Sequence, residues 1–253
     1  MGRRITDADL NSFAIRCFRD TADQDYIAAR LSYRAGLIPQ FHWSALQAIE
    51  KYLKGILLLN RIVAKNLSHD LELALAHADK LSFRIELTDG TRNLIKLLDT
   101  YGRFRYLETS WSIHGPRLCL LDRAVWEVRR YCQVLDFEGV FPDGSRRNLL
   151  SANLKALKAS EKLPHRHHLF GGRLEEIVAK ETHPARPGLI WQNLYFGSRG
   201  RKAVRMRTGF SAVNAPLSLH PEILEEVLRY VYLPKEVVKA FRAEICKRSK
   251  SRA

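Results

Sequence analysis

The stretch from Phe41 to Asn60 constrains the fold of this chain more than any other segment. Its apolar residues recur at spacings of three and four, which places them along one side of an α-helix. This apolar stripe consists of Leu46, Ile49, Leu53, Ile56 and Leu57. The opposite side carries Gln47, Glu50, Lys51 and Lys54, with Glu50 and Lys54 spaced for an ion pair within the helix. A helix with one long apolar side needs other helices to cover it, so the pattern predicts a helical bundle.

Four further amphipathic segments supply the partners of this helix. A first helix is expected to start after Thr6, whose hydroxyl can cap the amide of Asp9, and either to continue or to break at 21–23 before a stretch that ends at Gly36. The other segments are 69–81 with Ser68 as its cap, 89–106, and a helix from Pro116 whose stripe extends to Leu135. Short connections between such helices predict a mainly α fold, an antiparallel four- or five-helix bundle over residues 1–138.

The character of the chain changes after residue 138. A turn-rich break with two glycines and a proline lies at 139–144, so residues 139–253 are expected to form a separate C-terminal extension. Short helices are predicted at 150–163 and 174–180, and a β-hairpin over 189–210 that turns at 197–200. Two last helices, each opened by a proline, are predicted within 221–248.

Charge is the most informative property for function. The net formal charge is +15, and residues 151–253 hold 20 basic residues against nine acidic ones. An excess of this sign attracts polyanions such as nucleotides, RNA or anionic lipid. No apolar run is long enough for a membrane span, so we expect no membrane partner. The four cysteines lie far apart in the sequence, which predicts buried free thiols and a cytoplasmic location.

Several motifs of the bundle are typical of one family. The segment 25–37 ends in Ala35-Gly36-Leu37, and 41–54 carries Gln47-Ala48-Ile49-Glu50-Lys51 followed by Leu53-Lys54. Ser68-His69-Asp70-Leu71 and the Tyr101 to Tyr106 element follow in the same order. Over about residues 7–138 the chain resembles the HEPN family of helical bundles. This resemblance implies a homodimer associated with nucleotides or RNA.

The HEPN family divides into ribonucleases and non-catalytic members. Ribonuclease members of the family carry an Arg, four to six residues, and then a His, and none of the nine histidines here has that spacing. The chain is therefore more similar to the non-catalytic branch, whose members are inferred to bind nucleotides or to partner a minimal nucleotidyltransferase. Two alternatives stay open. One is a degenerate ribonuclease that uses an unusual combination such as Arg105 with His114 or His69, and the other is a protein-interaction module such as an antitoxin-like partner of a nucleotidyltransferase.

Candidate binding residues fall in three groups. Lys51 and Lys54 either line a phosphate-binding groove or belong to a solvated helix face. Arg103 and Arg105 can bind phosphate with a base stacked on Tyr106, or they can simply stabilise the end of a helix. Within the predicted hairpin, Arg201, Arg205 and Arg207 would share one face of a strand, preceded by aromatic residues as on nucleic-acid-binding surfaces.

Motifs for cofactors and metals are missing from the sequence. It contains no phosphate-binding P-loop and no dinucleotide-binding glycine motif. His165, His167 and His168 lie in one short loop without an acidic or cysteine partner nearby, which favours a solvated basic loop over a metal site. We therefore expect neither a cofactor nor a metal.

Overall fold

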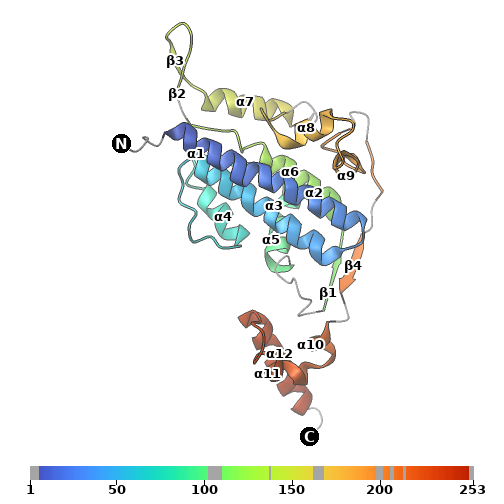
Figure 1. Cartoon of the computed structure of the whole chain (residues 1–253). Coiled ribbons are helices and arrows are strands. Elements are labelled where there is room, and N and C mark those ends of the chain that lie inside the picture. Colours follow the sequence, from blue (N-terminus) through green and yellow to red (C-terminus); the bar gives the residue numbers. More distant parts are fainter. Residues whose placement is uncertain are drawn as a thin grey trace. The chain divides into compact units, whose positions relative to one another are not determined.

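A computed structural model of the chain, drawn in Figure 1, describes residues 6–101, 110–136, 138–161, 168–197, 202–205, 208–212 and 215–250. Helices dominate these residues, and the strands form short two-stranded sheets. The predicted mainly helical bundle is confirmed. No helix among these residues is long and apolar enough to cross a membrane.

The chain divides into two compact units. The large unit comprises Met1–Arg103 and Arg117–Met206, and the small unit comprises Phe104–Pro116 and Arg207–Ala253. The expected boundary at residue 138 does not coincide with this division, since residues up to 206 belong with the bundle. The reason lies in long-range contacts of residues 169–196 with the bundle helices, which are described below.

The large unit contains most of the helices. Its elements are α1 (Asp7–Ala14), a π-helical turn (Ile15–Arg19), α2 (Asp20–Arg34), α3 (Ile38–Leu59), α4 (Leu71–Ala78), α5 (Asp89–Tyr101), α6 (Arg117–Arg129), β2 (Glu138–Val140), β3 (Arg146–Asn148), α7 (Leu150–Ser160), α8 (Arg173–Ala179) and α9 (Arg186–Ile190). Helix α3 contacts α2 along its length and also packs on α4, α5 and α6. Helices α8 and α9 pack on α2, so they lie on the other side of α2 from α4 (Figure 1).

The start and the end of the first helical stretch follow the sequence closely. Thr6 and Asp9 form a reciprocal cap, because the Thr6 hydroxyl accepts from the Asp9 amide at 3.3 Å and Asp9 accepts from the Thr6 amide at 2.9 Å. The chain then stays helical through the π-helical turn to Arg34, without a break at 21–23. Gly36 ends the stretch with a φ of +78°, a backbone conformation that glycine adopts without strain.

Helix α3 is the centre of the core. Its predicted stripe is fully buried, with Leu46, Ile49 and Ile56 at 0% exposure and Leu53 and Leu57 at 1%. Gly55 allows a close approach of the π-helical turn, since a Cβ there would lie 3.1 Å from the Cβ of Phe18. The stripe therefore organises the bundle as the periodicity predicted.

Two predicted helix ends need correction. The helix expected over 69–81 begins at Leu71 and ends at Ala78, and its cap is Asp70, whose side chain accepts from the Leu73 amide at 2.7 Å. Ser68 has a φ of +46° and lies in the preceding turn, so it is not the cap. Helix α6 ends at Arg129, although Cys132 beyond it is still buried. The expected end of the fourth helix near 106 lies outside the described residues.

Two buried ionic networks attach residues 169–196 to the bundle. Arg129 of α6 binds Asp23 of α2 and Glu175 of α8. Arg30 of α2 binds Asp122 of α6 and donates to the carbonyl oxygens of Gly188 and Trp191. The segment that the sequence assigned to a separate extension is thereby part of the large unit.

The predicted hairpin over 189–210 is wrong. Leu189 and Ile190 lie in α9, which Pro187 helps to start, and residues 191–197 form turns. The Asn193 side chain stabilises these turns by accepting from the amides of Tyr195 and Phe196 at 2.9 and 3.0 Å. Strand β4 (Gly209–Ala212) instead pairs antiparallel with β1 (Trp111–His114), about 100 residues earlier in the chain.

The small unit combines this β1–β4 pair with a compact helical segment. Its helices are α10 (Pro216–Leu219), a 3-10 turn (Pro221–Ile223), α11 (Leu224–Val227) and α12 (Lys235–Lys250). Leu217, Leu224, Leu233, Val237 and Phe241 form its buried core. Of the two helices predicted here, the second is confirmed as α12, whereas the first is replaced by short helical turns.

Candidate functional site

A buried carboxylate on α3 gathers several of the predicted site residues. Glu50 is 5% exposed. Its Oε1 accepts from Lys54 Nζ at 2.7 Å, and its Oε2 lies 2.8 Å from Nδ1 of His69 and 3.4 Å from Nε2 of Gln47. We call Gln47, Glu50, Lys54 and His69 the Glu50 cluster. The ion pair expected from the spacing of Glu50 and Lys54 is confirmed.

Local structure explains why His69 reaches the helix. Gln47, Glu50 and Lys54 are three and four residues apart, so they share one face of α3. His69 directly precedes Asp70, the cap of α4, and follows Ser68 with its left-handed backbone. Lys54 Nζ also donates to the Ser68 carbonyl at 2.7 Å, which holds this turn against α3.

The Glu50–His69 pair has the geometry of an oriented histidine. The carboxylate accepts the Nδ1 proton, which fixes the ring and its tautomer, while 45% of the His69 side chain stays exposed. The Trp43 ring contacts the imidazole edge-on at 5.7 Å. Histidines held in this way act as general acids or bases in other proteins, so His69 has the geometry that proton transfer requires.

Both lysines predicted to bind phosphate are engaged with carboxylates. Lys54 binds Glu50, and Lys51 forms an ion pair with Asp25 of α2. Burial raises the pKa of Asp25 above its ordinary value, although the Lys51 ammonium opposes that shift. A phosphate group at either lysine would have to compete with an existing ion pair. The side of α3 that carries Lys51 and Lys54 is half-buried rather than fully solvated.

The remaining predicted residues do not join this cluster. Arg103, Arg105, Tyr106, Arg201 and Arg207 lie outside the described residues. His114 is exposed on β1 in the small unit, opposite Gly209 in the strand register. Arg205 is exposed, and residues 202–205 form no strand. The Arg205 amide donates to the Gln192 side chain at 3.1 Å.

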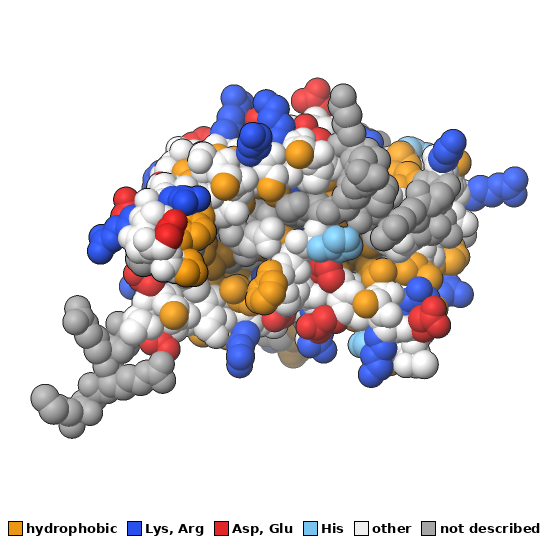
Figure 2. All heavy atoms as spheres, turned by 90° about the horizontal axis from the view of Figure 1, so that it is seen from above, with side chains coloured by type: hydrophobic (Ala, Val, Ile, Leu, Met, Phe, Trp, Pro, Cys, Tyr) orange, Lys and Arg blue, Asp and Glu red, His pale blue; other side chains and the backbone are white. Residues whose placement is uncertain are grey.

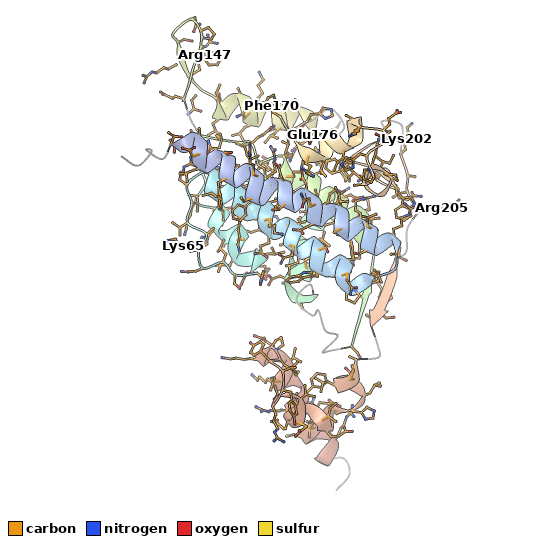
Figure 3. The ribbon with its side chains drawn as sticks, viewed as in Figure 1. Lys65, Arg147, Phe170, Glu176, Lys202 and Arg205 are labelled. Atoms are coloured by element: carbon orange, nitrogen blue, oxygen red, sulfur yellow. The ribbon has the colours of Figure 1, made fainter. Side chains whose placement is uncertain are left out.

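Exposed cations are spread over the large unit. On the face shown in Figure 2, Lys and Arg side chains lie around the rim with Asp and Glu between them. Lys202 and Arg205 lie on one edge of the large unit, Lys65 on the opposite edge and Arg147 on strand β3 (Figure 3). Within the described ranges, Lys202 and Arg205 have no carboxylate at ion-pair distance, whereas Arg147 pairs with Asp143 at 3.4 Å.

Sequence reasoning missed a hollow of about 440 Å³ beside α6, which we call the Tyr195 pocket. It is lined by Glu86, Leu87, Thr88, Arg123, Trp126, Glu127, Arg130, Glu161 and Tyr195. The spacing of Arg123, Trp126, Glu127 and Arg130 on one helix was the available signal. Nothing in the sequence indicates that Tyr195 joins them, because that contact depends on the docking of 169–196.

Other hollows lie at the far end of α4. One of about 550 Å³ includes Phe83, Arg84 and Arg92, and another of about 430 Å³ lies beside Arg61. The Arg61 side chain donates to Asp7 and Asn11 at 3.0 and 2.9 Å. Neither hollow includes a residue that the sequence singled out as a site.

The arrangement of the His, Cys, Asp and Glu side chains bears on metal binding and on thiol chemistry. In the part of the chain that the structure describes, no three His, Cys, Asp or Glu side chains are grouped so that they can hold a metal ion. The four cysteines are free thiols. The expectation that they are buried is wrong for Cys17 and Cys246, which are exposed, and right for Cys132. Burial raises the pKa of Cys132 to about 12.

No known protein family, curated protein or solved structure matches this chain.

Proposed function

We propose that this protein is a HEPN-type, non-catalytic homodimer that binds RNA or nucleotides through cations on the surface of the large unit. The motif resemblance supports the family and the dimer. The observation that carries polyanion binding is the distribution of charge. The excess of positive charge over the whole sequence is +15.

Among the described residues, buried arginines do not contribute to the positive excess. Among the described residues, the buried basic side chains are Arg19, Arg30, Arg129 and Arg130, and the buried acidic ones are Asp23, Glu50, Asp122 and Glu127. These two sets cancel in formal charge. Within the described ranges, the uncompensated cations therefore belong to exposed or half-exposed positions, where they attract polyanions and release counterions on binding.

Lys202 and Arg205 are the best candidates for direct phosphate contacts. They are exposed, lie on one edge of the large unit and lack an ion pair within the described ranges. Lys51 and Lys54 are weaker candidates because both already bind carboxylates. Arg205, which lies in the basic C-terminal part of the sequence, is thus part of the proposed interface.

Binding of a labelled single-stranded RNA, titrated with salt, tests this proposal. We expect binding that weakens linearly with the logarithm of salt concentration, and a slope that falls by about 1.4 in the Lys202→Ala/Arg205→Ala double variant. Lys65→Ala, on the opposite edge, is the matched control for the loss of one charge. Binding that is independent of salt, or absent, contradicts the proposal. Light scattering at the same protein concentration measures whether the chain is a dimer.

A ribonuclease is the second candidate function, and the Glu50–His69 pair favours it. The buried carboxylate would orient His69 for proton transfer at a 2′-hydroxyl or a leaving oxygen. Cleavage of the labelled RNA that is lost in both His69→Ala and Glu50→Gln supports this activity. RNA that stays intact with the parent protein leaves the non-catalytic function in place.

A further inference from the structure

The Tyr195 pocket collects residues from four separate parts of the chain. Segment 86–88 precedes α5, Arg123 to Glu127 lie on α6 with Arg130 directly after its end, Glu161 directly follows α7, and Tyr195 follows α9. None of its residues belongs to the Glu50 cluster. Its volume of about 440 Å³ lies within the range of roughly 300–1,000 Å³ that is usual for small-molecule sites.

Flat π-systems form one wall of the pocket. The rings of Trp126 and Tyr195 are 5.8 Å apart with an interplanar angle of 31°. The Arg130 guanidinium lies 4.4 Å from the centre of the indole, and both side chains are more than nine-tenths buried. Tyr195 is only half-buried, so its ring is the part of this stack that a ligand can reach. Such a surface favours a flat, conjugated ligand.

The Tyr195 ring is held in position from its edge. Arg123 Nε donates to the Tyr195 hydroxyl at 2.7 Å. Asn193, two residues earlier, fixes the backbone by accepting from the Tyr195 amide at 2.9 Å. The stacking surface is therefore in place before a ligand binds, which lowers the entropy lost on binding.

Donors and acceptors lie together at the rim. The Glu127 carboxylate is occupied, since it accepts from the amide and the hydroxyl of Thr88 at 3.0 Å each. By contrast, no bond within the described part of the chain uses the terminal nitrogens of Arg123 or the carboxylate of the exposed Glu86. These groups offer a ligand both hydrogen-bond donors and an acceptor.

The charge of the lining argues against a phosphate as the group that enters. Two arginines face three glutamates, which leaves a formal charge of −1 on the lining residues. A neutral, flat heterocycle with donors and acceptors on its edge fits this combination better than an anion does. Proteins bind unpaired bases in the same way, with the ring stacked on aromatic or guanidinium planes and the edge hydrogen-bonded.

We propose that the Tyr195 pocket binds a nucleobase, stacked on Tyr195 with its edge at Arg123 and Glu86. The base belongs to a free nucleotide or to an unpaired nucleotide of RNA, and in this respect the inference rests on the proposed function. The sugar and phosphate point away from the pocket, toward solvent. This pocket adds base recognition to an interface that otherwise contacts only phosphates.

Uncharged nucleosides test the pocket independently of phosphate contacts. Guanosine, adenosine, uridine and cytidine are titrated into the full chain by calorimetry. We expect saturable binding of at least one of them with little salt dependence, and binding roughly 10-fold or more weaker in Tyr195→Ala. Tyr195→Phe, which keeps the ring, stays within a few-fold of the parent. Tyr230→Ala, which removes a tyrosine exposed in the small unit, is the matched control.

A second variant tests the pocket in case Tyr195→Ala does not fold. Glu86 is exposed and its carboxylate makes no bond within the described ranges, so Glu86→Gln leaves the melting temperature unchanged while it alters the preference among the four nucleosides. Absence of saturable binding by all four nucleosides, or equal affinities in the parent, Tyr195→Ala and Glu86→Gln, would overturn the pocket.

An RNA and its abasic counterpart distinguish the two sources of the base. If the pocket takes a base of RNA, the abasic strand binds the parent more weakly than the intact strand, and Tyr195→Ala removes the difference. If it takes a free nucleotide, nucleosides bind and the two strands bind equally. Salt-dependent RNA binding without nucleoside binding, unchanged by Tyr195→Ala, contradicts the proposed base site but still supports RNA binding by the protein. Nucleoside binding without RNA binding supports the pocket and removes the phosphate interface.

Discussion

The guanidinium group of Arg129 donates to both carboxylate oxygens of Asp23, at 2.7 and 2.8 Å, in the interior of the large unit. Asp23 is fully buried and Arg129 is 3% exposed. Two more bonds, each of 2.7 Å, join Arg129 to Glu175 of α8. Burial opposes the charged form of Arg129, yet the carboxylates of Asp23 and Glu175 raise its pKa well above the ordinary value. One arginine therefore links α2, α6 and α8 as a permanent cation.

Removal of Asp23 should destabilise the large unit severely. Asp23→Ala leaves a buried guanidinium with one partner fewer, so we expect a loss of about 3–5 kcal/mol in the free energy of unfolding. Asp7→Ala removes an aspartate that is 88% exposed and paired with Arg61, and should cost less than about 1 kcal/mol. Urea denaturation followed by circular dichroism measures both. Equal losses in the two variants contradict the role assigned to the buried pair.

Stability should fall between neutral and mildly acidic pH because of His42. Burial, assisted by the charge of Arg117, lowers the pKa of His42 to about 4. In the unfolded chain the pKa is about 6.5, so below that value the unfolded state binds more protons than the folded state and stability is lost as the pH falls toward 4. Linkage gives a loss of about 2 kcal/mol between pH 7 and pH 5.

The variant His42→Phe isolates this contribution from that of the carboxyl groups. It keeps an aromatic ring beside Phe41, whose ring lies 5.1 Å from that of His42, but it cannot titrate. We expect the pH dependence of the unfolding free energy from pH 7 to pH 5 to shrink by about 2 kcal/mol relative to the parent. Parallel stability curves for the parent and the variant would show that His42 titrates equally in both states.

Thiol reactivity should separate the cysteines by burial. Cys17 and Cys246 are exposed, whereas Cys132 is buried with a pKa raised to about 12. Burial also raises the pKa of the partly buried Cys119. Since the thiolate is the reactive form, alkylation at pH 8 should label Cys17 and Cys246 first, Cys119 slowly and Cys132 only after unfolding. Peptide mass spectrometry at several times measures this order, and early labelling of Cys132 would contradict it.

The two lysines on α3 should matter less for RNA than the cations at 202 and 205. Lys54 is held by Glu50 and the Ser68 carbonyl, and Lys51 by Asp25. A phosphate must displace these partners, so we expect Lys51→Ala and Lys54→Ala to change RNA affinity less than Lys202→Ala or Arg205→Ala does. Filter binding at low salt compares the four variants. A larger effect of the α3 variants would move the interface to the Glu50 cluster.

Local sequence patterns were sufficient to predict much of the helical bundle. The stripe from Leu46 to Leu57 is buried as its period requires, because helical periodicity and burial of one side are properties of neighbouring residues. The cap at Thr6 and the end at Gly36 depend on contacts within a few residues, and both were predicted. The predicted cap at Ser68 was wrong, because Asp70 offers a better acceptor two residues later.

Sites that combine distant segments could be predicted only in part. The Glu50–Lys54 pair follows from spacing on one helix, whereas the approach of His69 to Glu50 depends on how the turn before α4 folds back. The Tyr195 pocket depends on a tyrosine about 70 residues beyond the arginine that holds it. No local pattern encodes such a distance.

The sequence by itself determined the helical class of this protein, the centre of its core and its excess of positive charge, because periodicity and composition are readable one segment at a time. Tertiary structure decided where β4 finds its partner in β1, that residues 169–196 belong to the bundle, and which charges are neutralised inside it. Those outcomes depend on the free energy of contacts between residues that are far apart in the chain. Several local conformations are compatible with each such segment until the contacts form.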